Sequence, residues 1–196
     1  MKRFRAGAVL TLVSMAVLPA AVAAQDTTSG PPTAILVDGP REGDRAPDFS
    51  LPWASRDTVA GAQWFGLSQQ RGRVVVLAFF PKAFTPGCTA EMKTFTERYA
   101  EYFGDDVTVV GISADSLHTQ QRFAASLGLP FRLLADVGQV VSKKYGSADR
   151  GGYNRRTVYV IGPNGRVSYV DLRFGALDPK SYTRLKEAVQ AARRGT

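Results

Sequence analysis

VVVLAFF, residues 74–80, is an unbroken run of β-branched and apolar side chains. A run of this kind is typical of a strand that is buried on both faces of a sheet. VTVVGI, residues 107–112, has the same character. The sequence therefore predicts at least two buried strands at the centre of one sheet.

The rest of the chain from residue 85 onward alternates between helical and extended patterns. Helical spacing is found over residues 85–103, 116–127, 137–145 and 181–192, and short β patterns over 131–135, 157–161 and 166–172. Pro163-Asn164-Gly165 separates the last two β patterns, and Asn-Gly between β runs is a strong hairpin signal. This order predicts an α/β protein, with the central mixed β-sheet flanked by helices of a thioredoxin-like fold.

Composition places the chain among ordinary globular proteins. It has 196 residues, of which 44% are hydrophobic and 21% charged, so one domain with a sizeable core is expected. The single cysteine, Cys88, excludes an internal disulfide. His118 is the only histidine, and a metal site needs several ligands at defined spacing, so neither a metal nor another cofactor is expected.

The first 24 residues have the pattern of a secretory signal peptide. A basic start, MKRFR, precedes an apolar stretch over residues 6–18 and a run of small residues that ends at Ala24. The apolar stretch is shorter than the roughly 20 residues that span a bilayer, so no stable membrane anchor is expected. We expect residues 25–42 to be a flexible linker, residues 43–196 to be the domain, and the protein to be exported, either periplasmic or secreted.

The charge excess does not indicate a nucleic-acid partner. Removing the predicted signal peptide lowers the formal net charge from +8 to +5. The remaining Lys and Arg residues are spread along the chain without a dense basic run or a recognisable nucleic-acid-binding module. A solvated basic surface is the simpler interpretation.

Cys88 is predicted to lie in the first turn of a helix that follows the strand over residues 74–80. Thr85 is a good N-cap residue and Pro86 suits the first helical position, so Cys88 would be the third residue of the helix. Free amides and the positive end of the helix dipole favour a thiolate there. A buried cysteine that only packs is the alternative, because free Cys is among the most often buried residues.

The spacing Pro81-x-x-x-Thr85-x-x-Cys88 resembles the active-site signature of the peroxiredoxins. The longer string FFPKAFTPGCTAEM, residues 79–92, is similar to the branch that contains bacterioferritin comigratory protein, and residues 43–49 resemble the opening of the family's domain. The resemblance implies a thiol-dependent peroxidase that reduces hydrogen peroxide or small organic hydroperoxides.

The resemblance also implies roles for individual residues. Cys88 matches the peroxidatic cysteine, which becomes a sulfenic acid when it attacks peroxide. Thr85 matches the threonine whose hydroxyl contacts the thiolate and the peroxide, and Pro81 the proline that shields the thiolate. Glu91 matches an acidic residue that orients the active-site arginine, although an exposed helix acid is an equally good interpretation.

The active-site arginine is expected from a distant strand. In the family it lies three residues before an aromatic residue that opens an apolar strand, and Tyr159 fits that aromatic residue, so the match is Arg156. Its guanidinium would stabilise the thiolate and the charge on the leaving oxygen. Arg155 is the alternative, and alternation along a strand would point it the other way.

One departure from the family is informative. Many relatives in this branch have a resolving cysteine five residues after the first, where this chain has Lys93. With no second cysteine, the sulfenic acid needs an external thiol or thiol protein as its reductant. Two alternatives remain at this stage: a redox sensor or partner-binding thioredoxin-like domain that does not turn over, and a structural domain with an inert cysteine. The assembly is expected to be a monomer or a homodimer.

Overall fold

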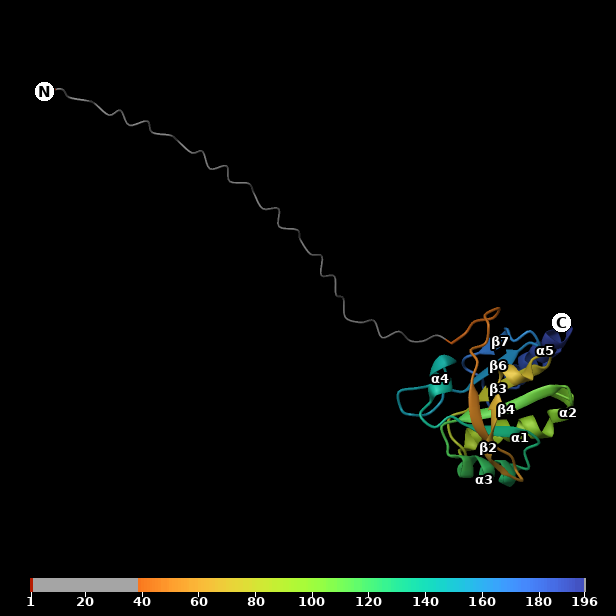
Figure 1. Cartoon of the computed structure of the whole chain (residues 1–196). Coiled ribbons are helices and arrows are strands. Elements are labelled where there is room, and N and C mark those ends of the chain that lie inside the picture. The colour runs from red at the N-terminus through yellow and green to blue at the C-terminus, as the bar shows by residue number, and fades with distance from the viewer. Residues whose placement is uncertain (2–38, 196) are drawn as a thin grey trace. The chain divides into compact units, whose positions relative to one another are not determined.

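The computed structural model describes Met1 and residues 39–195. The predicted signal peptide and most of the predicted linker lie outside the described residues. In the described part, seven strands form one sheet in the order β2-β1-β5-β4-β3-β6-β7 (Figure 1). The strands are β1 (Ser50–Ala54), β2 (Val59–Gly66), β3 (Val74–Phe79), β4 (Val107–Ser113), β5 (Arg132–Ala135), β6 (Thr157–Ile161) and β7 (Val167–Asp171).

Strand β3 is the buried strand that the run VVVLAFF predicts. All six of its residues are buried. It pairs with β4 in parallel and with β6 in antiparallel orientation, so the sheet is mixed as expected. Its side chains alternate between two apolar clusters, with Val76 and Ala78 in one and Leu77 and Phe79 in the other. Both faces of the sheet are therefore covered.

Five α-helices accompany the sheet in the described residues: α1 (Pro86–Glu97), α2 (Tyr99–Tyr102), α3 (Leu117–Leu127), α4 (Val140–Lys144) and α5 (Pro179–Arg194), together with a short 3₁₀ turn, η1 (Ser68–Gln70). Among residues 39–195 no helix is both long enough and apolar enough to cross a membrane. The predicted α/β class and thioredoxin-like arrangement are confirmed.

The single helix predicted over residues 85–103 is wrong in its second half. The helix is interrupted at Arg98, whose φ of −105° and ψ of 13° are not helical, and α2 forms a separate turn. The interruption lets the ring of Tyr99 stack on Phe131 at 6.0 Å while Phe103 meets Phe95 edge to face at 5.4 Å. Aromatic packing against the core thus determines where α1 ends.

Candidate active site

The loop that follows β3 leads directly into α1. Pro81 is half-buried just beyond the end of the strand, and Thr85 has the extended conformation of an N-cap residue, with φ −82° and ψ 150°. Helix α1 begins at Pro86, so Cys88 is its third residue. The cysteine is fully buried and unpaired. Its sulfur therefore lies at the helix end where backbone N–H groups lack intrahelical partners.

The side chain of Thr85 does not cap the helix. Its hydroxyl donates a hydrogen bond of 2.9 Å to the carbonyl oxygen of Lys82. Among the hydrogen bonds of the described residues, none joins Thr85 to Cys88. Its role as a contact of thiolate and peroxide, and the shielding role of Pro81, remain predictions from the resemblance.

Arg156 reaches the cysteine from the segment before β6. Its Nη2 lies 3.5 Å from Sγ of Cys88, within hydrogen-bond distance for sulfur. Its Nη1 forms an ion pair with Oε2 of Glu91, one turn further along α1. Arg155 turns away, because its side chain is exposed and donates to the carbonyl oxygen of Gly146. The structure thus brings Cys88, Glu91 and Arg156 together and leaves Arg155 outside.

Glu91 is a fully buried carboxyl group. Burial raises its pKa from 4.5 to about 7, although the charge of Arg156 and their hydrogen bond act to lower it. Its second oxygen, Oε1, has no hydrogen-bond partner. For Arg156, burial acts to lower the pKa, but the charges of Glu91 and Cys88 outweigh burial and raise it. The guanidinium therefore stays charged and is shared between a carboxyl group and the sulfur.

The buried carboxyl group should make stability depend on pH. An exposed glutamate in the unfolded chain titrates near 4.5, and Glu91 in the folded protein near 7, so the folded protein binds more protons between these values. The free energy of unfolding should therefore fall as pH rises through this window. In Glu91→Gln this pH-dependent decrease in the free energy of unfolding should be smaller by on the order of 1–3 kcal/mol. Urea unfolding of both proteins at pH 5 and pH 7.5 measures the difference; equal pH dependence would contradict the burial of an ionisable group here.

Gly87 is a member of the site that the sequence analysis did not single out as functional. A Cβ atom at this position would lie 3.2 Å from Nη2 of Arg156, which is a tight contact. The glycine therefore leaves room for the guanidinium beside Cys88. Its place between Pro86 and the cysteine is the only sequence signal that could have indicated this.

Gly87→Ala should separate stability from reactivity. Alanine favours a helix over glycine by up to about 1 kcal/mol, so the urea midpoint should stay equal or rise. The methyl group should displace the guanidinium by tenths of an ångström and slow oxidation of Cys88 by peroxide by about threefold to tenfold. Stopped-flow oxidation and urea unfolding measure the two effects; an unchanged rate would show that Arg156 tolerates the displacement.

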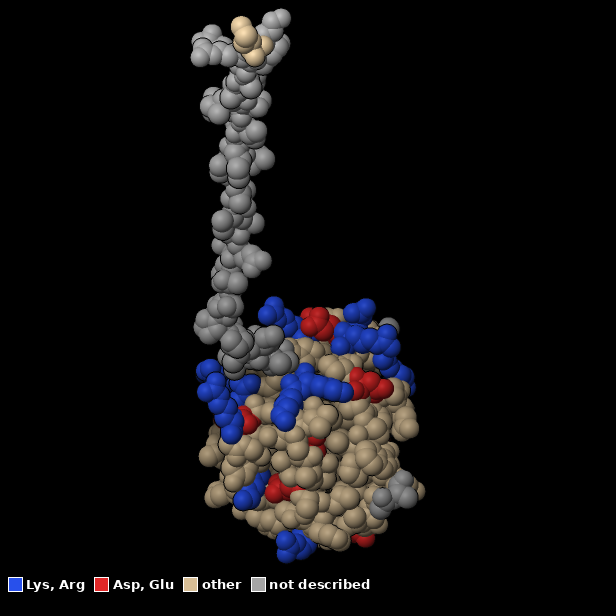
Figure 2. All heavy atoms as spheres, turned by 60° about the vertical axis from the view of Figure 1, so that its left-hand side comes forward, with Lys and Arg blue, Asp and Glu red and all other residues tan. Residues whose placement is uncertain are grey.

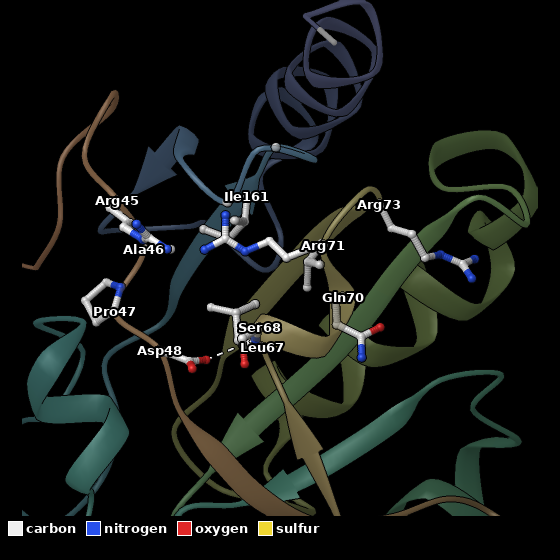
Figure 3. Close-up of a pocket in the computed structure, with 13 residues that line it drawn as sticks. Arg45, Ala46, Pro47, Asp48, Leu67, Ser68, Gln70, Arg71, Arg73 and Ile161 are labelled. Carbon is white, nitrogen blue, oxygen red and sulfur yellow. Dashed lines mark hydrogen bonds between the residues drawn. The ribbon is translucent and has the colours of Figure 1, made fainter.

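A separate cavity of about 270 Å³ lies at the other end of β3 (Figure 3). Its lining includes Arg45, Asp48, Arg71 and Ile161, and none of the site residues described above. Asp48 there accepts a hydrogen bond of 3.0 Å from the backbone of Ser68. Lys and Arg side chains gather towards one end of the face seen in Figure 2.

Comparisons with known proteins show what the chain is similar to. Residues 42–170 match the AhpC/TSA family. The protein is similar to the chloroplastic peroxiredoxin Q of Oryza sativa subsp. japonica, with 37% identity over 131 residues, which is 66% of this chain and 58% of the rice protein. The match to the chloroplastic peroxiredoxin Q of Triticum aestivum covers 62% of that protein's length. The chain thus spans less than two thirds of the length of these curated plant relatives.

Solved structures show the same fold. Peroxidoxin BcpB from Mycobacterium tuberculosis has 28% identity and a TM-score of 0.66, covering 78% of this chain and 97% of that one. The bacterioferritin comigratory protein of Xanthomonas campestris, described for its alkyl peroxide reduction activity, has 21% identity and a TM-score of 0.64. The latter match covers 74% of this chain and 92% of that one, and it supports the fold alone.

Proposed function

The chain belongs to the AhpC/TSA family, and from that premise we propose that it is a thiol-dependent peroxidase in which Cys88 is the nucleophile. The observation that supports this most directly is the distance of 3.5 Å between Nη2 of Arg156 and Sγ of Cys88 at the first turn of α1. A guanidinium beside the sulfur is placed to stabilise negative charge that develops on the reacting atoms during attack on a peroxide. A structural domain with an inert cysteine would not require a guanidinium beside the sulfur, so this contact favours the peroxidase.

The proposed reaction has two halves. The thiolate donates an electron pair to the terminal oxygen of the hydroperoxide, so that an S–O bond forms and the O–O bond breaks. The leaving alkoxide takes up a proton and departs as an alcohol, or as water when the substrate is hydrogen peroxide. The guanidinium of Arg156 stabilises the charge that develops on the leaving oxygen. Cys88 is then a sulfenic acid.

The second half needs a thiol from outside the chain. Position 93 is an exposed lysine, and the sequence contains one cysteine. An external thiol attacks the sulfenic sulfur, water leaves, and a mixed disulfide forms. A second thiol then releases Cys88 and carries away the disulfide. We propose hydrogen peroxide and small organic hydroperoxides as oxidants, and a small thiol or a thiol protein as reductant.

The test is the reaction of the reduced protein with one equivalent of hydrogen peroxide, followed by mass spectrometry as addition of one oxygen at Cys88. A free cysteine at the same pH is the reference, and Cys88→Ser is the blank. We expect a rate constant orders of magnitude above the reference. A rate no faster than free cysteine would contradict the peroxidase and leave a scaffold that binds a partner.

A redox sensor that is oxidised once is the second candidate, and the single cysteine favours it as much as the peroxidase. Both begin with the same oxidation step. They differ in how fast the oxidised cysteine returns to the thiol, because a peroxidase cycles rapidly with a suitable thiol and a sensor stays oxidised until its partner protein reacts with it. The rate of peroxide consumption per protein with excess dithiothreitol, after subtraction of the protein-free rate, distinguishes them: rapid sustained consumption supports the peroxidase, and consumption near the protein-free rate supports the sensor.

Export is part of the proposal, and it rests on the pattern of the first 24 residues. We propose a periplasmic or secreted protein that acts as a monomer or homodimer. Cell fractionation with sequencing of the mature N-terminus tests the location, and light scattering on the eluted protein gives the assembly. Full-length protein in the cytoplasmic fraction would contradict export.

A further inference from the structure

The loop that carries the active-site motif is tied to the end of β4 by the carboxylate of Asp115. The last backbone hydrogen bond between these chain segments runs from Phe80 N to Ile112 O at 3.0 Å. No further backbone hydrogen bond between the two segments follows among the described residues. Three residues beyond Phe80, the N–H of buried Ala83 donates to Oδ2 of Asp115 at 2.8 Å. A side chain thus links the two segments beyond their last backbone hydrogen bond.

The carboxylate itself is held by a chain of hydrogen bonds with one possible direction. Buried Gln120 donates through Nε2 to the carbonyl oxygen of Leu134 at 3.2 Å and to Oγ of Ser113 at 2.7 Å. The N–H of Asp115 also donates to this hydroxyl, at 3.2 Å. A serine hydroxyl has one proton, and with both lone pairs occupied it donates that proton to Oδ2 of Asp115 at 2.7 Å. Strand β5 and helix α3 therefore orient the carboxylate.

The loop needs such a tether because its backbone is strained. Phe84 has a φ of 63°, in the left-handed region that residues with a Cβ rarely adopt. Its side chain is 52% exposed, so burial contributes little to holding it. One ring contact, with Phe123 of α3 at 5.0 Å between centroids, involves the helix that begins two residues after Asp115. The next residue is Thr85, at the N-cap position of α1, so the conformation at Phe84 sets the start of the helix.

We propose that Asp115 is a positioning residue of the active site, which holds Ala83 so that the loop presents Thr85 and Cys88 in the geometry that reacts with peroxide. The inference rests on the proposed peroxidase function. Arg156 approaches Cys88 from β6, on one side of β3, and Asp115 acts from β4 on the other side. The distance between guanidinium and sulfur therefore depends on both attachments.

Three variants test the proposal. Asp115→Ala removes the acceptor, and we expect oxidation of Cys88 by one equivalent of peroxide to slow by about tenfold to hundredfold. Asp115→Asn keeps a carbonyl oxygen that can accept from both Ala83 and Ser113, so its rate should stay within about threefold of the unmodified protein. Should Asp115→Ala fail to fold, Asp115→Ser replaces it, because its oxygen is one bond too short to reach Ala83 and the same loss is expected.

Asp178→Ala is the matched control. Asp178 accepts hydrogen bonds from the backbone of Lys180 at 3.0 Å and from Oγ of Ser181 at 3.1 Å at the start of α5, so its loss removes the same kind of contact outside the loop. Its oxidation rate should be unchanged within about threefold. An unchanged rate in Asp115→Ala would overturn the proposal. The proposal would also be overturned if Asp178→Ala, or Asp115→Asn, lost as much of the oxidation rate as Asp115→Ala.

Amide hydrogen exchange separates this inference from the proposed function. In the reduced protein without peroxide, exchange at Ala83 should be at least about tenfold faster in Asp115→Ala than in the unmodified protein and unaltered in Asp178→Ala. Unaltered exchange at Ala83 in Asp115→Ala would overturn the tether whatever the oxidation rates are. A second outcome is that the unmodified protein reacts no faster than free cysteine while the exchange at Ala83 responds as expected. The proposed peroxidase function is then contradicted, and the positioning role of Asp115 in peroxide chemistry is overturned with it. The hydrogen bond between Asp115 and Ala83 is confirmed as a tether of the loop.

Discussion

Arg156→Ala should slow the oxidation of Cys88 by hydrogen peroxide by about 10²–10³-fold, the loss usually seen when a preorganised donor is removed from a reaction centre. The guanidinium contacts the sulfur at 3.5 Å and is anchored by Glu91. Without it, the sulfur loses the positive charge 3.5 Å away and, in the proposed reaction, the leaving oxygen loses a donor. The buried carboxyl group would also lose its partner, and its pKa, already raised to about 7, should rise further. The rate is measured on reduced protein by stopped flow at several peroxide concentrations.

Arg155→Ala is the matched control for this prediction. The two arginines are neighbours, yet Arg155 is exposed and donates to the carbonyl oxygen of Gly146. Its removal should change the oxidation rate by less than about threefold, since exposed residues away from the reacting atoms contribute little. A large loss in Arg155→Ala, with little loss in Arg156→Ala, would exchange the roles assigned to these two residues.

The largest loss of stability is expected from Phe95→Ala. Phe95 is fully buried on α1, and its ring lies 5.4 Å from Phe103, 6.1 Å from Phe174 and 5.9 Å from Tyr182. Truncation of a buried phenylalanine typically costs about 3–5 kcal/mol, because apolar area is lost and a cavity remains. Urea unfolding gives the free energy. This cluster attaches α1 to α5, so the loss reports how firmly the helix that carries Cys88 is held.

Leu177→Ala provides the comparison. Its side chain is 81% exposed, and the substitution should change the free energy of unfolding by less than about 0.5 kcal/mol. A cost for Phe95→Ala below about 1 kcal/mol would mean that the aromatic cluster relaxes around the cavity. In that event α5 could shift onto α1 without loss of the fold.

Local signals in the sequence were sufficient for the parts of the site that are close together in the chain. A buried strand, a threonine at the N-cap position and Pro86 fix where α1 begins, and counting then places Cys88 third. The arginine could be indicated only through the resemblance, because no local rule relates position 156 to position 88. Burial of Glu91 was left open for the same reason, since it depends on Arg156.

The missed features depend on contacts between distant segments. Asp115 follows a buried strand that runs parallel to β3, and nothing near it shows that its carboxylate accepts from Ala83. The left-handed backbone at Phe84 has no signal in its residue type, which normally avoids that conformation. The interruption at Arg98 is set by aromatic partners such as Phe131, more than thirty positions further along the chain. The helical spacing of the sequence continues past Arg98, so periodicity alone predicts an uninterrupted helix.

The antiparallel pairing of β3 with β6 has a consequence for biosynthesis. Cys88 and Arg156 are 68 positions apart in the chain, and they meet because the register of these strands sets Phe79 opposite Thr157. Bringing such distant segments together requires closure of a long loop, which is slow compared with winding a helix. A nascent chain therefore carries its thiol without the guanidinium. The environment of the sulfur that the proposed function requires is therefore a property of the completed tertiary structure, and a chain that has not yet paired β3 with β6 lacks it.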